Sequence, residues 1–342
     1  MKSKVAFHTL GCKLNFAETS TIGDQFLKHG FDIVDYNLHA DVYVINTCTV
    51  TENADKECRQ IVRRVLRNNP NAFVIVTGCY AQLRPEEISK IEGVNAVLGS
   101  NEKFKLFEYI NNFENKELSC IHVSPTEELN SFYTSHSSDA DERTRAFFKI
   151  QDGCDYKCSF CTIPLARGES RSAKPEEVLK EFKELLNAGY KEIILTGVNV
   201  GDYESETSLD HIHNHTSRIK DTNSTINLFH LLSMMLNIEG DYRIRISSIE
   251  PNLLNNEILN LTHNNKKMCN HFHIPLQSGN DKILRLMQRR YKTEDYKTLI
   301  FNAVNKIENV AIGVDVIVGF PGETEDDFLD TYNFLKDLPI AY

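Results

Sequence analysis

Short apolar runs alternate with amphipathic stretches over the first 112 residues of the chain. Four runs have the length and the β-branched content of buried strands, at residues 5–10, 42–46, 73–77 and 96–98. Between them, apolar residues recur with helical spacing, at residues 15–29, 52–68, 85–91 and 103–111. Alternating strands and helices are typical of a parallel sheet with helices on both faces. We therefore predict an α/β fold that begins with a doubly wound parallel sheet.

The same alternation returns after residue 143. Strands are predicted at residues 147–151, 192–196, 242–246, 272–275 and 313–318. Helices are predicted at residues 175–187, 228–236, 255–260, 281–287, 293–305 and 325–338. Five strand–helix units in series indicate a partial (β/α) barrel.

In two hydrophilic segments, apolar residues recur with neither helical nor strand periodicity. Residues 118–143 are predicted to be a linker between an N-terminal domain, 1–117, and a second domain, 144–342. Residues 204–227 are predicted to be a surface insertion, and they carry His211, His213 and His215. Alternating histidines in a polar loop are more often solvent-facing than metal-binding, so we assign them no site.

Composition narrows the protein class. Apolar residues make up 41% and charged residues 25%, which is typical of globular proteins. The apolar runs are too short for a signal peptide or a membrane span, so we expect a cytoplasmic protein without membrane contact. Nine cysteines in that compartment are expected to bind metal or react as thiols. The net charge of −10 leaves RNA binding to local basic patches.

Three cysteines follow the strand predicted at residues 147–151. Cys154, Cys158 and Cys161 have the spacing C-x3-C-x2-C. Three such thiolates can bind three irons of a cubane cluster and leave the fourth iron open to a cofactor. A closed zinc site needs four ligands, and neither Cys nor His occurs in the next twenty residues. The spacing therefore favours a [4Fe-4S] cluster over a zinc knuckle.

A second set of cysteines is dispersed through the N-terminal domain. Cys12, Cys48 and Cys79 each follow the end of a predicted strand. Because the carboxyl ends of parallel strands line one crevice, the three thiols are expected to share a metal site. Cys58, Cys120 and Cys269 lack this placement and are expected to be structural.

The motif around Cys154 resembles the signature of the radical S-adenosylmethionine superfamily, with Phe160 before the last cysteine. The resemblance implies that Cys154, Cys158 and Cys161 are the catalytic cluster ligands and that S-adenosylmethionine is cleaved to a 5′-deoxyadenosyl radical. It also implies that residues after the barrel strands contact this cofactor. The candidates are Gly197, Asn199, Ser247, Glu250 and Gln277.

A three-cysteine domain ahead of such a barrel resembles the methylthiotransferase family over nearly the whole chain. The resemblance implies two [4Fe-4S] clusters, with sulfur mobilised and methylated at the N-terminal one. One S-adenosylmethionine would donate the methyl group and another would generate the radical. A reducing electron donor such as flavodoxin or ferredoxin is also implied.

Two stretches resemble the branch that acts on N6-threonylcarbamoyladenosine at tRNA position 37. They are T-L-G-C-K-L-N-F-A-E-T, from Thr9, and C-T-I-P-L-A-R-G-E-S-R-S, from Cys161. The isopentenyladenosine branch usually has G-C-Q-M-N at the first site, and the ribosomal-protein branch has G-C-P-K-N. Three alternatives stay open: isopentenyladenosine as substrate, a ribosomal-protein aspartate as substrate, and a truncated iron–sulfur protein without catalysis.

Three basic groups are candidates for tRNA contact. They are Arg59 with Arg63, then Arg285 with Arg289, Arg290 and Lys292, and finally Arg167 with Arg171. Such basic groups more often form a solvated face, and only Arg167 is predicted to contact RNA. Family members usually continue with a sixth barrel strand and a small RNA-binding module of the TRAM type. Because the sequence stops at Tyr342, we expect both to be missing.

Overall fold

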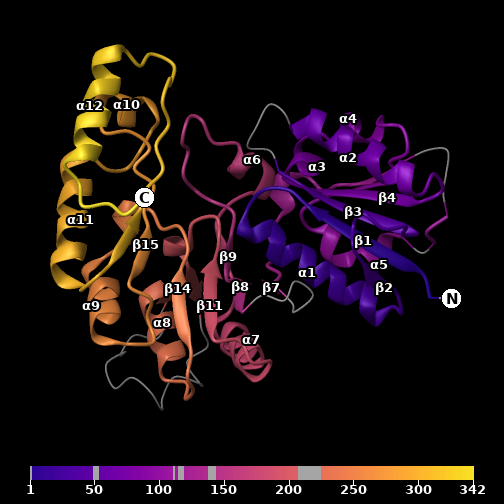
Figure 1. Ribbon diagram of the computed structural model, residues 1–342, viewed down its shortest axis with the longest axis horizontal. Helices are drawn as coiled ribbons and strands as arrows, with labels where there is room; N and C mark the ends of the chain where they lie inside the picture. The colour runs from indigo at the N-terminus through magenta and orange to yellow at the C-terminus, as the bar shows by residue number, and fades with distance from the viewer. Residues whose placement is uncertain (1, 49–53, 111, 115–118, 138–143, 207–224) are drawn as a thin grey trace. The chain divides into compact units, whose positions relative to one another are not determined.

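The computed structural model describes residues 2–48, 54–110, 112–114, 119–137, 144–206 and 225–342. The chain forms two compact units (Figure 1). The first comprises Met1–Arg143, Phe147–Lys149 and Thr162–Glu169, and the second comprises Thr144–Ala146, Ile150–Cys161 and Ser170–Tyr342. Two short segments that follow residue 143 therefore fold with the N-terminal residues.

The first unit contains a six-stranded parallel sheet in the order β2-β1-β3-β4-β5-β6. The predicted strands are confirmed as β1 (Lys4–Thr9), β3 (Val42–Thr47), β4 (Phe73–Gly78) and β5 (Ala96–Leu98). The edge strands β2 (Asp32–Val34) and β6 (Cys120–His122) were not predicted, because their residues are exposed or only partly buried and do not form a continuous apolar run as those of β5 do. The prediction of a linker was wrong for residues 120–122, which form β6, and for residues 135–136, which form a further strand.

Helices cover both faces of this sheet (Figure 1). Alternate strand residues point to opposite faces, so Val42 and Val44 pack with α1 (Lys13–Lys28) and α5 (Leu106–Tyr109). Tyr43 and Ile45 lie in the core of the other face, under α2 (Ala54–Asn68), α3 (Cys79–Leu83) and α4 (Pro85–Ser89). The doubly wound sheet is confirmed.

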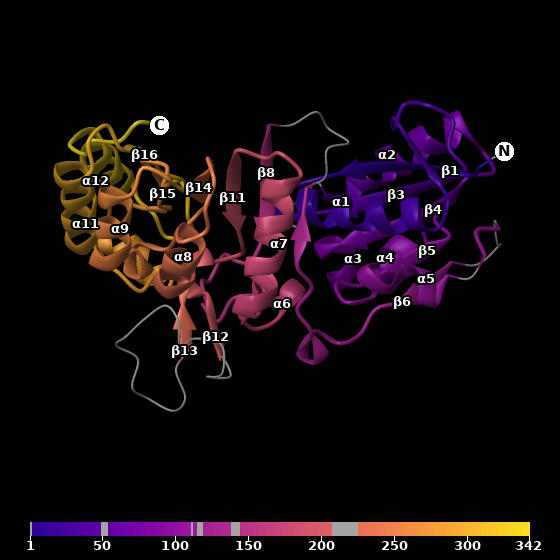
Figure 2. The same ribbon diagram turned by 90° about the horizontal axis from the view of Figure 1, so that it is seen from below.

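The second unit has parallel strands with helices along one side (Figure 2). β11 (Glu192–Thr196) pairs with β14 (Arg243–Ile246), and β15 (His271–His273) pairs with β16 (Ala311–Gly313). A parallel bridge between Ser248 and His273 connects the two pairs. The helices lie where they were predicted: α7 (Pro175–Asn187), α8 (Leu228–Leu236), α9 (Asn256–Asn264), α10 (Asp281–Leu286), α11 (Thr293–Lys306) and α12 (Glu325–Lys336). This is the predicted partial barrel.

Two strand predictions need correction. The strand predicted at residues 147–151 divides into β8 (Arg145–Lys149), which pairs with β7 (Ser135–His136), and β9 (Gln151–Asp152), which pairs with β10 (Arg171–Ser172). The last strand ends at Gly313 instead of residue 318. Beyond Gly313 the backbone pairs only at an isolated parallel bridge, between Val316 and Gln277, and Val316 and Val318 are 37% and 59% exposed.

The predicted insertion at residues 204–227 begins and ends in a short antiparallel hairpin, β12 (Glu204–Glu206) with β13 (Thr225–Asn227). His211, His213 and His215 lie outside the described residues. Among the helices that the structure describes, none is long and apolar enough to cross a membrane.

Candidate functional site

Three of the cysteines of the first unit lie where three neighbouring strands end. Cys12 is the N-cap of α1 after β1, Cys48 follows β3 and Cys79 opens α3 after β4. These strands are adjacent and parallel, with Thr9 opposite Asn46 and Thr47 opposite Gly78. Cys12 is exposed, Cys48 is half-buried and Cys79 is buried. The three thiols therefore share one edge of the sheet, as predicted.

Close backbone packing brings these strand ends together. Gly11 has a φ of +97°, and a Cβ atom there would lie 2.6 Å from Cys48 Cβ. Gly78 has a φ of +98°, and a Cβ atom there would lie 2.2 Å from the Thr47 carbonyl oxygen. Both positions combine a backbone conformation that favours glycine with a lack of space for any side chain.

Polar side chains fix the same strand ends. The Asn15 side-chain amide donates to the carbonyl oxygens of Leu10, at 2.8 Å, and Thr47, at 3.1 Å. The Asn46 amide donates to the Asn15 carbonyl oxygen at 3.1 Å. Because these bonds are largely shielded from water, they hold the loops that carry Cys12 and Cys48 at a fixed spacing.

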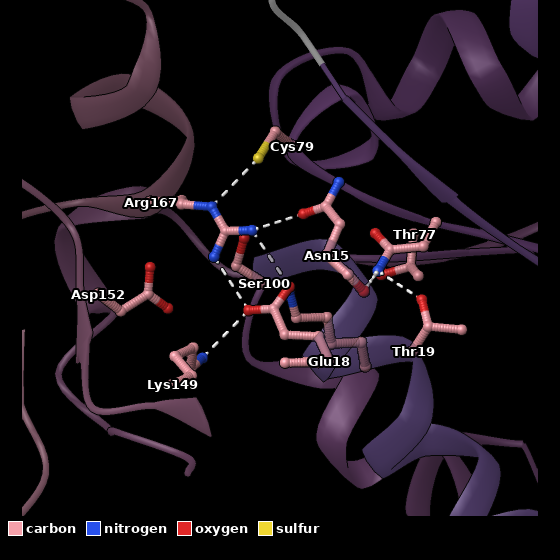
Figure 3. Close-up of polar contacts among 12 residues, drawn as sticks. Asn15, Glu18, Thr19, Thr77, Cys79, Ser100, Lys149, Asp152 and Arg167 are labelled. Atoms are coloured by element: carbon pink, nitrogen blue, oxygen red, sulfur yellow. Dashed lines mark hydrogen bonds and ion pairs between the residues drawn. The ribbon is translucent and has the colours of Figure 1, made fainter. Parts of the chain in front are cut away.

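A buried ionic cluster lies beside Cys79 (Figure 3). The Glu18 carboxylate accepts from Lys103 Nζ at 2.7 Å, Lys149 Nζ at 3.0 Å and Arg167 Nη1 at 2.9 Å. All four side chains are at most 2% exposed. Burial alone would raise the pKa of Glu18, but Arg167, Lys103 and Lys149 hold it well below its ordinary value.

Arg167 connects this ionic cluster to the cysteine site. Its Nε donates to Cys79 Sγ at 3.2 Å, and its Nη2 donates to Asn15 Oδ1 at 2.8 Å (Figure 3). Burial raises the pKa of the Cys79 thiol, and the positive charge of Arg167 opposes that shift. The predicted contact of Arg167 with RNA is therefore wrong, because its guanidinium is buried among protein groups.

The second cysteine set occupies one loop of the second unit. Cys154, Cys158 and Cys161 follow β9, and all three are partly buried. The backbone N–H of Tyr156 donates to Cys154 Sγ at 3.4 Å. Burial, with a further contribution from the neighbouring Cys161 and Cys158, raises the pKa of Cys154 to about 11. The three sulfurs are thus close enough to interact electrostatically.

Two arginines from the turn after α10 reach this loop. Arg289 Nη1 donates to Cys158 Sγ at 3.0 Å, and Arg289 Nη2 forms an ion pair with Glu250. The Arg290 guanidinium stacks 3.7 Å from the centre of the Tyr156 ring and donates to the Asp155 carbonyl oxygen. The Arg289 side chain is 3% exposed, so it lies neither on the solvated face favoured for its basic group nor where it could contact RNA.

The predicted cofactor contacts follow the strands of the same unit. Gly197 and Asn199 come after β11, Ser247 and Glu250 after β14, and Gln277 after β15. Asn199 is 3% exposed, and neither its Oδ1 nor its Nδ2 has a partner among the described residues. A buried amide without partners costs about 1–3 kcal/mol, so this side chain is suited to a polar ligand.

Both cysteine sets fit iron–sulfur clusters by the chemistry of their donors. Each offers three thiols, and each has an arginine N–H directed at one sulfur. Across the described part of the chain, no group of three Cys, His, Asp or Glu side chains is arranged around a single metal ion. A cubane cluster spreads its cysteine ligands over separate irons and does not need that arrangement.

Sequence reasoning missed several residues of these sites. Glu18 lies one turn from Leu14 and from Ile22, both buried, so a charge on the apolar face of α1 was a readable signal. Gln151 was also missed. Its Oε1 accepts from the Asn199 backbone N–H at 2.9 Å, and its Nε2 donates to the Gly153 carbonyl oxygen at 2.8 Å. It joins the cysteine loop to the β11 loop.

Two family models match the chain. Residues 4–99 match a family described as uncharacterized protein family UPF0004, and residues 148–335 match the radical SAM superfamily. Among solved structures, the radical S-adenosylmethionine methyltransferase TsrM from Kitasatospora setae has a TM-score of 0.64 at 15% identity. The match covers 98% of this chain and 74% of that one. This likeness shows the fold alone.

Curated relatives match over almost the whole chain. The threonylcarbamoyladenosine tRNA methylthiotransferase MtaB of Bacillus subtilis is 42% identical, over 97% of this chain and 70% of the relative. The protein of the same name from Aquifex aeolicus is 38% identical, over 99% and 78%. The tRNA-2-methylthio-N(6)-dimethylallyladenosine synthase of Clostridium tetani is 33% identical, over 98% and 72%.

Proposed function

The chain belongs to the radical S-adenosylmethionine family of tRNA methylthiotransferases, and from this premise we propose its substrate and the roles of its two cysteine sets. The substrate is N6-threonylcarbamoyladenosine at position 37 of tRNA, and the reaction replaces the C2 hydrogen with a methylthio group. The run G-C-K-L-N from Gly11 to Asn15 supports this branch. So do the names of the relatives that are 42% and 38% identical.

Each cysteine set is proposed to hold a [4Fe-4S] cluster, with Cys154, Cys158 and Cys161 at the radical-generating site and Cys12, Cys48 and Cys79 at the sulfur-transfer site. When bound, the first of these clusters supplies the electron that cleaves S-adenosylmethionine. Two S-adenosylmethionine molecules serve each product: one gives its methyl group, and the other takes up the C2 hydrogen as 5′-deoxyadenosine. The electron is proposed to come from flavodoxin or ferredoxin.

The residues of the second unit are proposed to bind and orient the cofactor. Asn199 offers both a donor and an acceptor, and Gly197 lies against Gln151 with no room for a side chain. A Cβ atom on Gly197 would lie 2.7 Å from Gln151 Oε1. Ser247, Glu250 and Gln277 complete the proposed contacts. The observation that carries the proposal is the gathering of Cys154, Cys158 and Cys161 after β9.

The test is anaerobic reconstitution of the wild-type chain and of a triple variant, Cys154→Ala, Cys158→Ala and Cys161→Ala. We expect about eight irons in the wild type and about four in the variant, because each cubane holds four irons. After dithionite reduction, 5′-deoxyadenosine should form only in the wild type. With tRNA that carries N6-threonylcarbamoyladenosine, mass spectrometry of digested nucleosides should detect the 2-methylthio derivative.

A matched reaction uses tRNA that carries isopentenyladenosine. The relative from Clostridium tetani makes this the second candidate substrate. Methylthiolation of that nucleoside alone would replace the proposed substrate while leaving the radical mechanism in place. About four irons in the wild type, with no cleavage of S-adenosylmethionine, would contradict the mechanism itself.

Asn199 gives a separate prediction. Asn199→Leu should weaken S-adenosylmethionine binding about tenfold or more, because one to two hydrogen bonds to a charged ligand are lost. The same change should leave the thermal midpoint of the ligand-free chain unchanged or higher, since it removes a buried amide without partners. Equilibrium dialysis and thermal unfolding measure the two effects.

The matched control is Thr196→Val. Thr196 Oγ1 is also buried without a partner among the described residues, but Thr196 is not a proposed cofactor contact. The control should raise stability and keep cofactor affinity. If both variants bind S-adenosylmethionine as the wild type does, Asn199 has no role in cofactor binding.

A further inference from the structure

Both cysteine sets contain the same arrangement of side chains, an arginine that pairs with a glutamate and donates to a cysteine sulfur. The two arrangements come from unrelated parts of the chain. In the first unit, Arg167 pairs with Glu18 through two nitrogens, at 2.9 and 3.1 Å, and directs Nε at Cys79 Sγ. In the second unit, Arg289 pairs with Glu250 and directs Nη1 at Cys158 Sγ. In both cases a carboxylate, fully buried at Glu18 and 17% exposed at Glu250, anchors the guanidinium, and another N–H points at sulfur.

The anchoring carboxylate gives each arginine one orientation. A guanidinium is planar and stays charged, so fixing one of its edges also fixes the directions of its remaining N–H groups. Arg167 and Arg289 are 2% and 3% exposed, which removes competition from water for the sulfur. Arg289 has a second anchor, because its Nε donates to the Tyr291 hydroxyl at 3.3 Å. The contacts of these two guanidinium groups hold an N–H donor at the sulfur and do not present the group to an external ligand.

We propose that Arg167 and Arg289 are positioning residues that donate hydrogen bonds to Cys79 and Cys158 and thereby raise the reduction potentials of the clusters held there. The inference rests on the proposed cluster sites. Reduction adds negative charge to a cluster, and part of that charge lies on the cysteine sulfurs, so a fixed cationic donor stabilises the reduced state. Hydrogen bonds from a charged donor are among the stronger ones in proteins, so we expect loss of this bond to shift the reduction equilibrium roughly tenfold.

The experiment isolates one cluster at a time in the full chain. Arg289→Gln is placed in a background that lacks Cys12, Cys48 and Cys79, and Arg167→Gln in one that lacks Cys154, Cys158 and Cys161. Iron content is measured, and the midpoint potential is then determined by EPR-monitored redox titration. We expect each variant to keep its cluster with the one-electron reduction equilibrium shifted tenfold toward the oxidised state, about 59 mV lower.

The control for Arg289 is its neighbour. Arg290→Gln removes an equal charge that also contacts the cysteine loop, through Tyr156 and the Asp155 carbonyl oxygen and not through sulfur. Its potential should stay near that of the parent. Arg63→Gln, an exposed position of α2, is the control for Arg167. If Arg289→Gln and Arg290→Gln shift the potential equally, charge alone is responsible and the hydrogen-bond role is wrong.

Loss of iron from a glutamine variant does not end the test. Arg167→Lys and Arg289→Lys keep the charge but lack the planar fork, so they should retain iron with a lowered potential. Parent-like potentials in the lysine or glutamine variants overturn the proposal. If the parent backgrounds themselves bind no cluster, the failure lies in the proposed function and not in the arginines.

Discussion

Replacing Gly78 by alanine is expected to destroy the cysteine site of the first unit and to lower the stability of its sheet by about 2–6 kcal/mol. A left-handed φ costs a residue with a side chain about 1–3 kcal/mol, and overpacking adds about 1–3 kcal/mol. Both apply here, because φ is +98° and the new Cβ would lie 2.2 Å from the Thr47 carbonyl oxygen. Backbone cannot yield as a flexible side chain does, so β3 and β4 must separate at Cys79.

Gly30 is the matched control for this change. Its φ is +85°, yet an added Cβ would meet nothing within 4 Å. Gly30→Ala should therefore cost only the conformational strain, about 1–2 kcal/mol, with iron content unchanged. Iron analysis after reconstitution and hydrogen exchange of peptides from β3 and β4 measure both effects. Equal losses in the two variants would show that close packing at Gly78 does not hold the site together.

The cysteine sets could be predicted because each cysteine is placed by a feature that can be read in the nearby sequence, either the end of a strand or the spacing within one loop. Each cysteine of the first set follows a strand, and parallel pairing brings strand ends to one edge regardless of their separation in sequence. The second set lies within a single loop, so its spacing alone brought the thiols together. The doubly wound sheet followed from the alternation of strands and helices in the same way.

The roles of the arginines could not be predicted, because they depend on tertiary partners. Arg167 lies six residues after Cys161, and sequence proximity associated it with that cysteine set. Its segment instead folds with the first unit, where Ser100 Oγ donates to the Ala166 carbonyl oxygen at 3.1 Å. Arg289 belongs to a run of basic residues that resembles a phosphate-binding patch. Nothing in the run distinguishes the buried member from its exposed neighbours.

Glu18→Gln is expected to lower the stability of the first unit by about 3–5 kcal/mol at neutral pH. The change is nearly isosteric, but it removes the charge that Arg167, Lys103 and Lys149 share in a buried site. Breaking a buried ion pair from one side leaves the partners with their desolvation uncompensated, which is the source of this cost. Urea-dependent hydrogen exchange of peptides from α1 gives the free energy of unfolding for this region.

The control is Glu87→Gln. Glu87 pairs with Arg84 at 3.5 Å on the surface, where the two side chains are 52% and 63% exposed. A screened surface pair contributes about 0–1 kcal/mol, so this variant should resemble the wild type. Similar losses in Glu87→Gln and Glu18→Gln would mean that the buried cluster contributes no more than a surface pair.

The pH dependence provides an independent check on Glu18. Its pKa is held well below its ordinary value in the folded chain, whereas an unfolded glutamate titrates near about 4.3. The stabilisation is therefore fully present above about pH 5 and is lost progressively as the pH falls through the folded pKa, because protons then bind the unfolded state first. Glu18→Gln has no such group, so the stability difference between wild type and variant should shrink toward acid. A difference that stays constant from neutral pH to about pH 3 would assign the cost to packing instead of charge.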